Sequence, residues 1–414
     1  MYRSLPIKFP LISMVMSIAV AASVGLPLGL LSGCNGPPNP ASSEFWHTGN
    51  FRLLESMSAD LVSFVQGLDH PSKGEYGKLS STRKANFNAF LEALFSAIDA
   101  SLADGNAGDW CSVKSKAATA GYAIARFFDT DSGRWFVFGQ DTTPFGQAYF
   151  FINPFAKRNI VIEVPHEGLE QDTGSEGARI LKALAARALI INKEDRCSDP
   201  DSSPCAKFAT KVCNGVIRES DVAHHTANAF YLLHVRYSDM DPQTKFIQLH
   251  GMSATAADDV AEIGDGTNVD VDADSASVSN KFAQALRSSV AAAAGAGVRG
   301  CQEAAGDPPS NLCGETNAEA RYTHNPSDAE CPAAASKSSK RFVHVEQQKT
   351  LRDDDNSDGW NWVVVRDALK ATWPDCNMNK GDVDCSLGPR LAQPEALTCP
   401  ALPTPSAGGS SPKA

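Results

Sequence analysis

The chain has 414 residues and a formal net charge of −11 at pH 7. This length is sufficient for one large domain or two smaller ones. The excess of acidic residues argues against nucleic acid as a partner, because binding to phosphates needs clustered basic residues.

The first 33 residues follow the pattern of an export signal. Arg3 and Lys8 give a positively charged start, and residues 9–31 are uncharged and mostly apolar. The stretch ends in "LSGC", which resembles a bacterial lipobox. This resemblance implies that residues 1–33 are removed and that Cys34 is lipidated.

A lipid on Cys34 would anchor the chain in a membrane. Pro10 and Pro27 interrupt the apolar stretch, which argues against a transmembrane helix. Asn35, in place of Asp, favours the outer membrane of a Gram-negative cell envelope, with the chain on its periplasmic or surface side. Residues 34–43 form the expected tether.

An even number of cysteines in an exported chain implies disulfides and an oxidising compartment. Ten cysteines remain besides Cys34, and none forms a C-x-x-C pair, which argues against a structural zinc knuckle. Two local pairings are expected, Cys301–Cys313 and Cys376–Cys385, and the remaining connectivity stays open.

The first elements after the tether are helical. Apolar residues recur with helical spacing over 52–68 and 81–104, so 44–110 is predicted to be an N-terminal helical segment. A β-rich stretch follows. Residues 123–128 and 134–139 are predicted to form a hairpin around the turn "DTDSG".

Beyond the hairpin, strands alternate with helices. In chain order we predict strands at 147–152 and 159–164, a helix from Ser175, a strand at 187–191, a helix at 227–235, a strand at 245–251, a helix at 280–294, a strand at 341–346 and a helix at 360–373. The alternation predicts an α/β domain over 111–400, with a mixed, largely parallel sheet and helices on both faces. The tail, 401–414, is predicted to be disordered.

Polar residues of one chemical class lie at the ends of three of these strands. "NIVIEVPHEGLE" brings His166, Glu167 and Glu170, "KFIQLHG" brings His250, and "RFVHVEQ" brings Glu346. Ligands bind at the carboxyl ends of strands in open α/β sheets, so these side chains are expected to meet. Two histidines, a carboxylate and a separate glutamate satisfy the needs of a zinc hydrolase.

These motifs resemble the zinc carboxypeptidase superfamily, most closely its poly-γ-glutamate hydrolase-like branch, over residues 159–372. "VPHEGLEQDTGSEGA", "FIQLHG" and "FVHVEQQKTLR" are similar to its first histidine loop, second histidine strand and late glutamate strand. The resemblance implies a zinc-carboxypeptidase-like (phosphorylase/hydrolase-like) fold and zinc as cofactor. It also implies a set of site residues, with three metal ligands and one catalytic base: His166, Glu170 and His250 as ligands, and Glu346 as base.

The acidic ligand stays open between Glu170 and Glu167. The better-known carboxypeptidases use His-x-x-Glu, but Leu169 stands at that position here. Neighbouring side chains at a strand end often point apart, which favours Glu170 over Glu167 beside His166.

Further residues are candidates for substrate binding. An oxyanion is expected to be stabilised by Arg352 or Arg321. The superfamily holds a terminal carboxylate with Asn and Arg, and Asn317 and Arg321 are candidates, with a disulfide-pinned loop as the alternative. Arg196 is interpreted as a partner for a substrate carboxylate or as part of a surface salt bridge.

In "SDVAHHTANAF", Asp221 is interpreted as a helix N-cap or, with His224, as support behind the metal ligands. The sequence therefore predicts a membrane-anchored, zinc-dependent hydrolase that cleaves an amide bond in a peptide, with cell-wall or γ-glutamyl peptides as candidate substrates. The alternative is a non-catalytic surface lipoprotein that has a hydrolase-like fold and binds a partner or a glycan.

Overall fold

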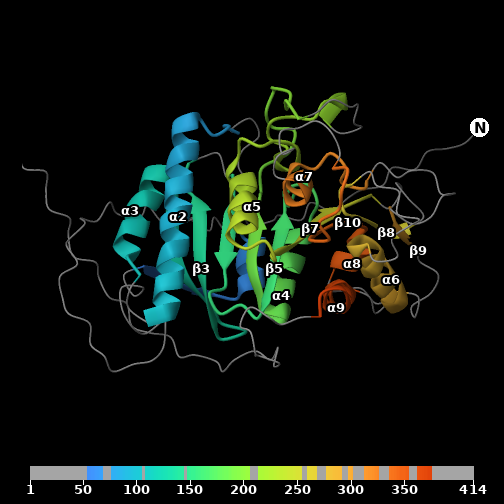
Figure 1. Ribbon diagram of the computed structural model, residues 1–414, viewed down its shortest axis with the longest axis horizontal. Helices are drawn as coiled ribbons and strands as arrows, with labels where there is room; N and C mark the ends of the chain where they lie inside the picture. The colour runs from blue at the N-terminus through green and yellow to red at the C-terminus, as the bar shows by residue number, and fades with distance from the viewer. Residues whose placement is uncertain are drawn as a thin grey trace, which may run out of the picture. The chain divides into compact units, whose positions relative to one another are not determined.

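A ten-stranded sheet runs through the computed structural model of the chain (Figure 1). The strands are β1 (Glu55–Ala59), β2 (Tyr122–Asp129), β3 (Arg134–Asp141), β4 (Tyr149–Ile152), β5 (Arg158–Val164), β6 (Ala186–Ile191), β7 (Lys245–Gly251), β8 (Asp259–Gly264), β9 (Gly297–Gly300) and β10 (Phe342–Gln347). The structure describes residues 54–68, 76–104, 108–143, 147–205, 213–253, 259–267, 277–290, 297–301, 312–325, 335–353 and 361–374.

The sheet is mixed, and its strand order is β1-β2-β3-β4-β6-β5-β7-β10-β8-β9. Four neighbouring strands, β6, β5, β7 and β10, are parallel to one another. The pairs β1–β2 and β8–β9 are also parallel, whereas β2–β3, β3–β4, β4–β6 and β10–β8 are antiparallel. The predicted α/β class, with a mixed and mostly parallel sheet, is confirmed.

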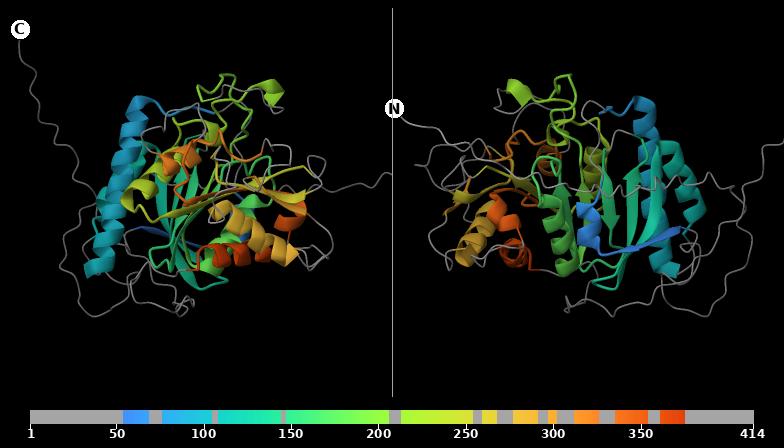
Figure 2. Two further views of the ribbon diagram at one scale, coloured as in Figure 1. Left: turned by 45° about the vertical axis from the view of Figure 1, so that its right-hand side comes forward. Right: turned by 180° about the vertical axis from the view of Figure 1, so that it is seen from behind.

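Helices cover both faces of the sheet (Figure 2). They are α1 (Leu61–Gln66), α2 (Ser81–Asp104), α3 (Trp110–Ala120), α4 (Thr173–Leu184), α5 (Ala229–Met240), α6 (Val278–Val290), α7 (Ala318–His324), α8 (Lys349–Arg352) and α9 (Trp362–Thr372). One buried cluster joins the sheet to α1, α4, α6 and α9, and the other joins it to α2, α3, α5 and α7.

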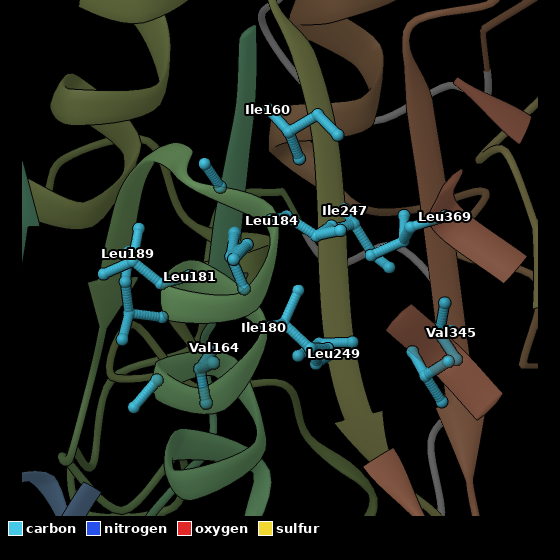
Figure 3. Packing of buried hydrophobic residues seen from close by; sticks show 14 of the residues in the cluster. Ile160, Val164, Ile180, Leu181, Leu184, Leu189, Ile247, Leu249, Val345 and Leu369 are labelled. Atoms are coloured by element: carbon cyan, nitrogen blue, oxygen red, sulfur yellow. The ribbon is translucent and has the colours of Figure 1, made fainter. Parts of the chain in front are cut away.

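Helix α4 shows why these elements form. Its apolar residues recur every three or four positions, so Ile180, Leu181 and Leu184 share a face that packs on the sheet (Figure 3). The helix begins after Asp172 and ends at Ala185, both in the left-handed backbone region. Full burial of each Leu or Ile contributes about 1.5–3 kcal/mol to stability. This outweighs the unfavourable helix propensity of the two glycines within the helix.

Strand β10 alternates as its sequence predicts. Val343 and Val345 lie in the cluster on the α4 face, whereas Phe342 lies in the cluster on the α5 face. His344 and Glu346 follow Phe342 by two and four residues, so they lie on the α5 face as well.

Several predicted elements need correction. The helix expected over 52–68 is wrong in its first half, because Glu55–Ala59 forms β1 and pairs in parallel with β2. The segment 44–110 is therefore not entirely helical. Helix α2 matches its predicted range, but α3, α7, β8 and β9 were not predicted, because their sequences lack a clear period.

The predicted disulfide between Cys301 and Cys313 is confirmed, and a second joins Cys197 to Cys213. The pair Cys376–Cys385 lies outside the described residues, as do the signal segment with Cys34, the tether and the tail. Among the helices that the structure describes, none has the length and apolar character needed to cross a membrane.

Candidate metal centre

The candidate site lies at the carboxyl ends of three neighbouring parallel strands. His166 follows β5, His250 lies near the end of β7, and Glu346 lies near the end of β10. The β7–β10 register places His250 beside Glu346. The parallel arrangement thus brings together residues that are up to 180 positions apart in the sequence.

Two histidines and one glutamate form a compact buried set. His166 Nδ1 lies 3.1 Å from Glu170 Oε1, and His250 Nδ1 lies 3.4 Å from Glu170 Oε2. Ligand atoms from His166, Glu170 and His250 all lie within 4.8 Å of one another. Four tetrahedral ligands at 2.0–2.2 Å from zinc are separated by about 3.3–3.6 Å, so both contacts are close to the spacing that an ion requires.

The far nitrogen of His166 is held by an acceptor. Its Nε2 lies 2.9 Å from Asp221 Oδ1. A carboxylate behind a histidine fixes the ring and keeps the proton on the bonded nitrogen. This leaves Nδ1 as the nitrogen that faces Glu170.

A glutamine orients His250 in the same way, as a hydrogen-bond acceptor for its far nitrogen. Its Nε2 lies 2.7 Å from Gln248 Oε1, which also accepts a short hydrogen bond from Asn317 Nδ2. The Gln248 amide donates to Glu163 Oε2 at 3.2 Å, which fixes its orientation. Glu163 is held in turn by His234, whose Nδ1 lies 2.7 Å from Glu163 Oε1. Because Gln248 Oε1 can only accept, His250 carries its proton on Nε2 and leaves Nδ1 free.

Glu167 is placed elsewhere, although it is next to His166 in the sequence. Its carboxylate accepts hydrogen bonds from the hydroxyl of Thr173, at 2.8 Å, and from the backbone N–H of Gly174. It therefore stabilises the N-terminus of α4. Of the two acids considered for the metal site, Glu170 is the one beside the histidines.

The guanidinium of Arg196 lies at the same ligand atoms. Its Nη2 donates to Glu170 Oε1 at 2.6 Å, and its Nη1 lies 3.3 Å from His166 Nδ1. Arg196 is thus neither free for a substrate in this arrangement nor part of a surface salt bridge. An ion bound at His166 Nδ1 would displace this contact, because the nitrogen has a single lone pair.

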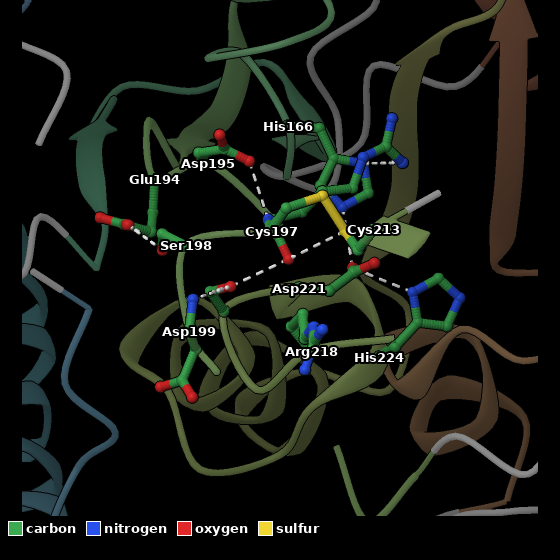
Figure 4. Close-up of a disulfide and its surroundings, with 12 residues drawn as sticks. His166, Glu194, Asp195, Cys197, Ser198, Asp199, Cys213, Arg218, Asp221 and His224 are labelled. Atoms are coloured by element: carbon green, nitrogen blue, oxygen red, sulfur yellow. Dashed lines mark hydrogen bonds and ion pairs between the residues drawn. A yellow bond between two sulfur atoms is a disulfide. The ribbon is translucent and has the colours of Figure 1, made fainter. Parts of the chain in front are cut away.

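A disulfide beside the site restrains Arg196. Cys197 is bonded to Cys213, and Figure 4 shows this bond close to His166 and Asp221. The hydroxyl of Ser220 donates to the backbone carbonyl of Arg196 at 2.9 Å. The segment with the arginine and the segment with Asp221 are therefore tied together next to the candidate ligands.

Asp221 does not cap a helix with its side chain. It precedes the short 3₁₀ helix Val222–His224 without bonding its N–H groups. Its Oδ1 lies 2.9 Å from His224 Nδ1 as well as from His166 Nε2. His224 in turn bonds Thr316 through Nε2 at 2.9 Å. Asp221 and His224 thus lie behind His166, in accord with the interpretation that they support the metal ligands.

Glu346 lies beside the set and makes no hydrogen bond with any residue that the structure describes. Its Oε1 is 4.0 Å from His250 Nδ1 and 3.8 Å from His344 Nε2. Burial, together with the nearby negative charge of Glu170, raises the pKa of Glu346 to about 8. A carboxyl group of this kind exchanges protons near neutral pH, which is the property of a general base.

Electrostatics differ between the two histidines. Burial and Arg196 act to lower the pKa of His166, but Glu170 and Asp221 outweigh them and raise it to about 9. Burial lowers the pKa of His250 to about 4. Burial acts against the charged form of Glu170, yet the two histidines and the arginine hold its pKa well below the usual range. Binding of a metal ion would therefore require His166 to lose a proton.

The structure does not bring Arg352 to Glu346. Arg352 donates through Nη1 to the backbone carbonyl of Gln171 and packs over Gly251, where a Cβ would come within 2.5 Å of Nη1. It lies on the α4 face, whereas Glu346 faces α5. Helix α8, which carries Arg352, begins only two residues after β10 and packs against α9 and α4.

Asn317 and Arg321 are not free to bind a substrate in this arrangement. Asn317 caps α7 by accepting from the backbone N–H of Ala320 at 2.9 Å, and its amide holds Gln248. Arg321 is 1% exposed and donates to the backbone carbonyls of Thr316 and Asn317. Both residues therefore support the site from within the fold.

Two important residues were missed by sequence reasoning. Gln248 and His344 each precede a candidate site residue by two positions on the same strand. The period of two puts each of them on the same face as His250 or Glu346, and this signal could have identified both.

The residues fit a zinc ion. Imidazole nitrogens and a carboxylate are ligands that zinc accepts, and Nδ1 of each histidine faces Glu170. The Nδ1 of His250 has a free lone pair, and that of His166 gains one when the ring loses its proton. The carboxylate of Glu346, which bonds no described residue, lies nearby. Burying several carboxylates and imidazoles together costs free energy unless a cation compensates their negative charge. Here the guanidinium of Arg196 supplies part of the positive charge.

Comparisons with known proteins give little. No family model matches the sequence, and no curated protein matches it. Among solved structures, the chain is similar to the gene product Atu2144 of Agrobacterium tumefaciens, with 13% identity and a TM-score of 0.31 over 55% of this chain and 93% of that chain. A likeness of this degree carries no argument about function.

Proposed function

We propose that this chain is a zinc-dependent hydrolase that cleaves an amide bond in a peptide. The observation that carries the proposal is the convergence of His166, His250 and Glu170, with each histidine held at Nε2 so that Nδ1 faces Glu170. Glu346 lies 4.0 Å from one of these nitrogens without a hydrogen-bond partner among the described residues.

In this proposal His166, Glu170 and His250 hold the ion. Bound zinc supplies a Lewis acid that lowers the pKa of water toward about 7. Glu346 accepts a proton from the attacking water at a carboxylate oxygen and delivers it to the leaving nitrogen. Its raised pKa supports this role, because both protonation states are then accessible near neutral pH.

Arg196 takes the role that was expected of Arg352 or Arg321. Its guanidinium is already at the ligand atoms, and its attachment to the disulfide segment limits how far it can move. Arg196 and Glu346 are close enough to interact electrostatically, so once displaced from His166 Nδ1 the N–H groups of Arg196 would act near the attacking water. There they stabilise the negative charge that develops on the carbonyl oxygen.

The substrate class and location rest on the sequence. A lipid anchor at Cys34 would hold the enzyme in the cell envelope, within reach of cell-wall peptides. The family resemblance adds γ-glutamyl peptides as a second candidate substrate. An enzyme that cleaves either peptide needs no nucleic-acid-binding surface.

One observation favours the alternative, a lipoprotein that binds a partner or a glycan without catalysis. The Arg196–Glu170 contact of 2.6 Å neutralises the carboxylate without an ion. In a non-catalytic protein this ion pair would be a permanent structural feature.

Metal analysis separates the two functions. Under buffered, nanomolar free zinc, the purified chain is expected to hold one tight ion, and His166→Ala and Glu170→Gln are expected to lose it. Glu167→Gln is the matched control and is expected to keep it, because that carboxylate caps α4. A wild-type chain that holds no zinc and cleaves no peptide in a mixed peptide library would favour the binding lipoprotein.

A further inference from the structure

His344 is a buried imidazole that the proposed chemistry does not use. It is 4% exposed, and its buried Nδ1 has no hydrogen-bond partner among the residues that the structure describes. Its Nε2 points at Glu346 Oε1 from 3.8 Å, which is too far for a hydrogen bond. The nitrogen that matters here is Nε2, because it lies near a buried carboxylate oxygen without a hydrogen bond between them.

Glu346 lies among other acidic groups. The β10–β8 register places it directly opposite Glu262, so both side chains lie on the same face of the sheet. Glu170 adds negative charge, and the repulsion from both carboxylates acts on Glu346, while the positive charges of Arg196 and His166 offset part of it. Like charges directly opposite each other on neighbouring strands are destabilising, so a cation at this point would relieve the repulsion.

We propose that His344 and Glu346 form a second binding site for a divalent transition-metal ion such as zinc. The ion would lie between His344 Nε2 and Glu346 Oε1. His250 completes a group whose ligand atoms all lie within 4.8 Å of one another. Imidazole and carboxylate together suit zinc and similar ions.

The second site is weaker than the first. His250 Nδ1 can bind only one ion, so with the first site filled the second has two protein ligands and water. The separations of 3.8 Å and 4.0 Å around Glu346 also exceed the spacing of about 3.3–3.6 Å that zinc favours, so its side chain must move by a few tenths of an ångström. Without the first ion, His250 becomes available as a third ligand.

Zinc stoichiometry of the full chain tests this inference. By equilibrium dialysis and elemental analysis at saturating zinc, His344→Phe and Glu346→Gln should each bind one ion fewer than wild type. Both variants should keep the tight ion at nanomolar free zinc. Glu346→Gln is nearly isosteric, so it remains informative if His344→Phe does not fold.

Two control variants test whether a lower zinc count is specific to this site. His324→Phe removes a partly buried histidine, whose nitrogens contact Ser339 and the backbone of Asp265, and it should not change the count. Asp201→Asn, in the acidic group of Asp199, Asp201 and Glu219, should not change it either.

The outcomes distinguish the second site from the first. His166→Ala should lose the tight ion but bind one ion at His250, His344 and Glu346, and adding His344→Phe should abolish that binding. Equal zinc counts for wild type, His344→Phe and Glu346→Gln would overturn the second site and leave the first untouched. Loss of the weak ion in Asp201→Asn would also overturn it, because the ion would then lie in the acidic group.

Discussion

Gln248 Oε1 lies 2.7 Å from Nε2 of His250, two residues further along the same strand. The glutamine is itself fixed, because its amide donates to Glu163 and its oxygen accepts from Asn317. This arrangement selects the form of His250 that has a free lone pair on Nδ1. The ring is therefore oriented before any ligand arrives.

Gln248→Leu is expected to weaken binding of the tight zinc ion by about 10–100-fold, the usual effect of removing a partner behind a metal ligand. Competition with a chromophoric chelator measures this change. Gln248→Glu keeps an acceptor for His250 and should recover part of the affinity.

A matched control is available on the neighbouring strand. Gln347 is also fully buried and donates its amide to a carboxylate, that of Glu176, but it lies on the opposite face of the sheet. Gln347→Leu should lower the melting temperature without a comparable loss of zinc. Equal losses of zinc affinity in the two variants would contradict the orienting role of Gln248.

Glu346→Gln is expected to reduce amide hydrolysis by about 10²–10⁴-fold, because a general base contributes about that factor. Tight zinc content and the melting temperature should change little, since the carboxylate holds neither the tight ion nor a described partner. Turnover on a peptide that the wild type cleaves gives the measurement. Full activity in the variant would rule out Glu346 as the base.

Glu176→Gln is expected to stabilise the fold increasingly as pH rises. Burial raises the pKa of Glu176 to about 8, against which Arg352 and a hydrogen bond from Gln347 act only in part. Between pH 4.5 and 8 the folded chain keeps this proton while the unfolded chain has lost it, so the free energy of unfolding falls as pH rises.

Thermal unfolding at pH 5, 7 and 9 tests this sign. The melting temperature of Glu176→Gln, relative to wild type, should rise from pH 5 to pH 9, because the amide has no proton to lose. A difference that stays constant or falls across this range would show that Glu176 is ionised in the folded chain.

The disulfide beside Arg196 is expected to stabilise the fold. Cys197 and Cys213 are 16 residues apart, and closing a loop of about this size is worth about 3 kcal/mol in the chain-entropy account. Replacement of both by serine should lower the free energy of unfolding in urea by about that amount. A loss below about 0.5 kcal/mol would mean that the hydrogen bonds of this segment suffice to hold it.

Cys34→Ala tests the membrane anchor. Acyl chains supply nearly all the membrane affinity of a lipoprotein, so the variant should remain unprocessed or appear in the soluble fraction. Cell fractionation with a salt wash gives the result. A variant that is processed normally and still sediments with membranes would contradict the lipobox interpretation.

The sequence by itself determined the strands that carry the site. Buried parallel strands are short apolar runs, so β5, β7 and β10 are visible without a structure, and each is followed by or ends in a polar residue. The period of two then assigns His344 and Glu346 to one face and Val343 and Val345 to the other. These are local properties, and local sequence is enough to fix them.

Tertiary structure decided which polar residues meet. Glu167 and Glu170 are equivalent by composition, but the N-terminus of α4 binds the first and leaves the second beside the histidines. Arg352 follows Glu346 closely in the chain, yet the turn into α8 carries it to the other face of the sheet. Arg196 reaches the ligands because β6 lies next to β5 and a disulfide holds its segment there. Such contacts depend on the order of strands and the packing of helices, to which residues distant in the sequence contribute, so no local pattern encodes them.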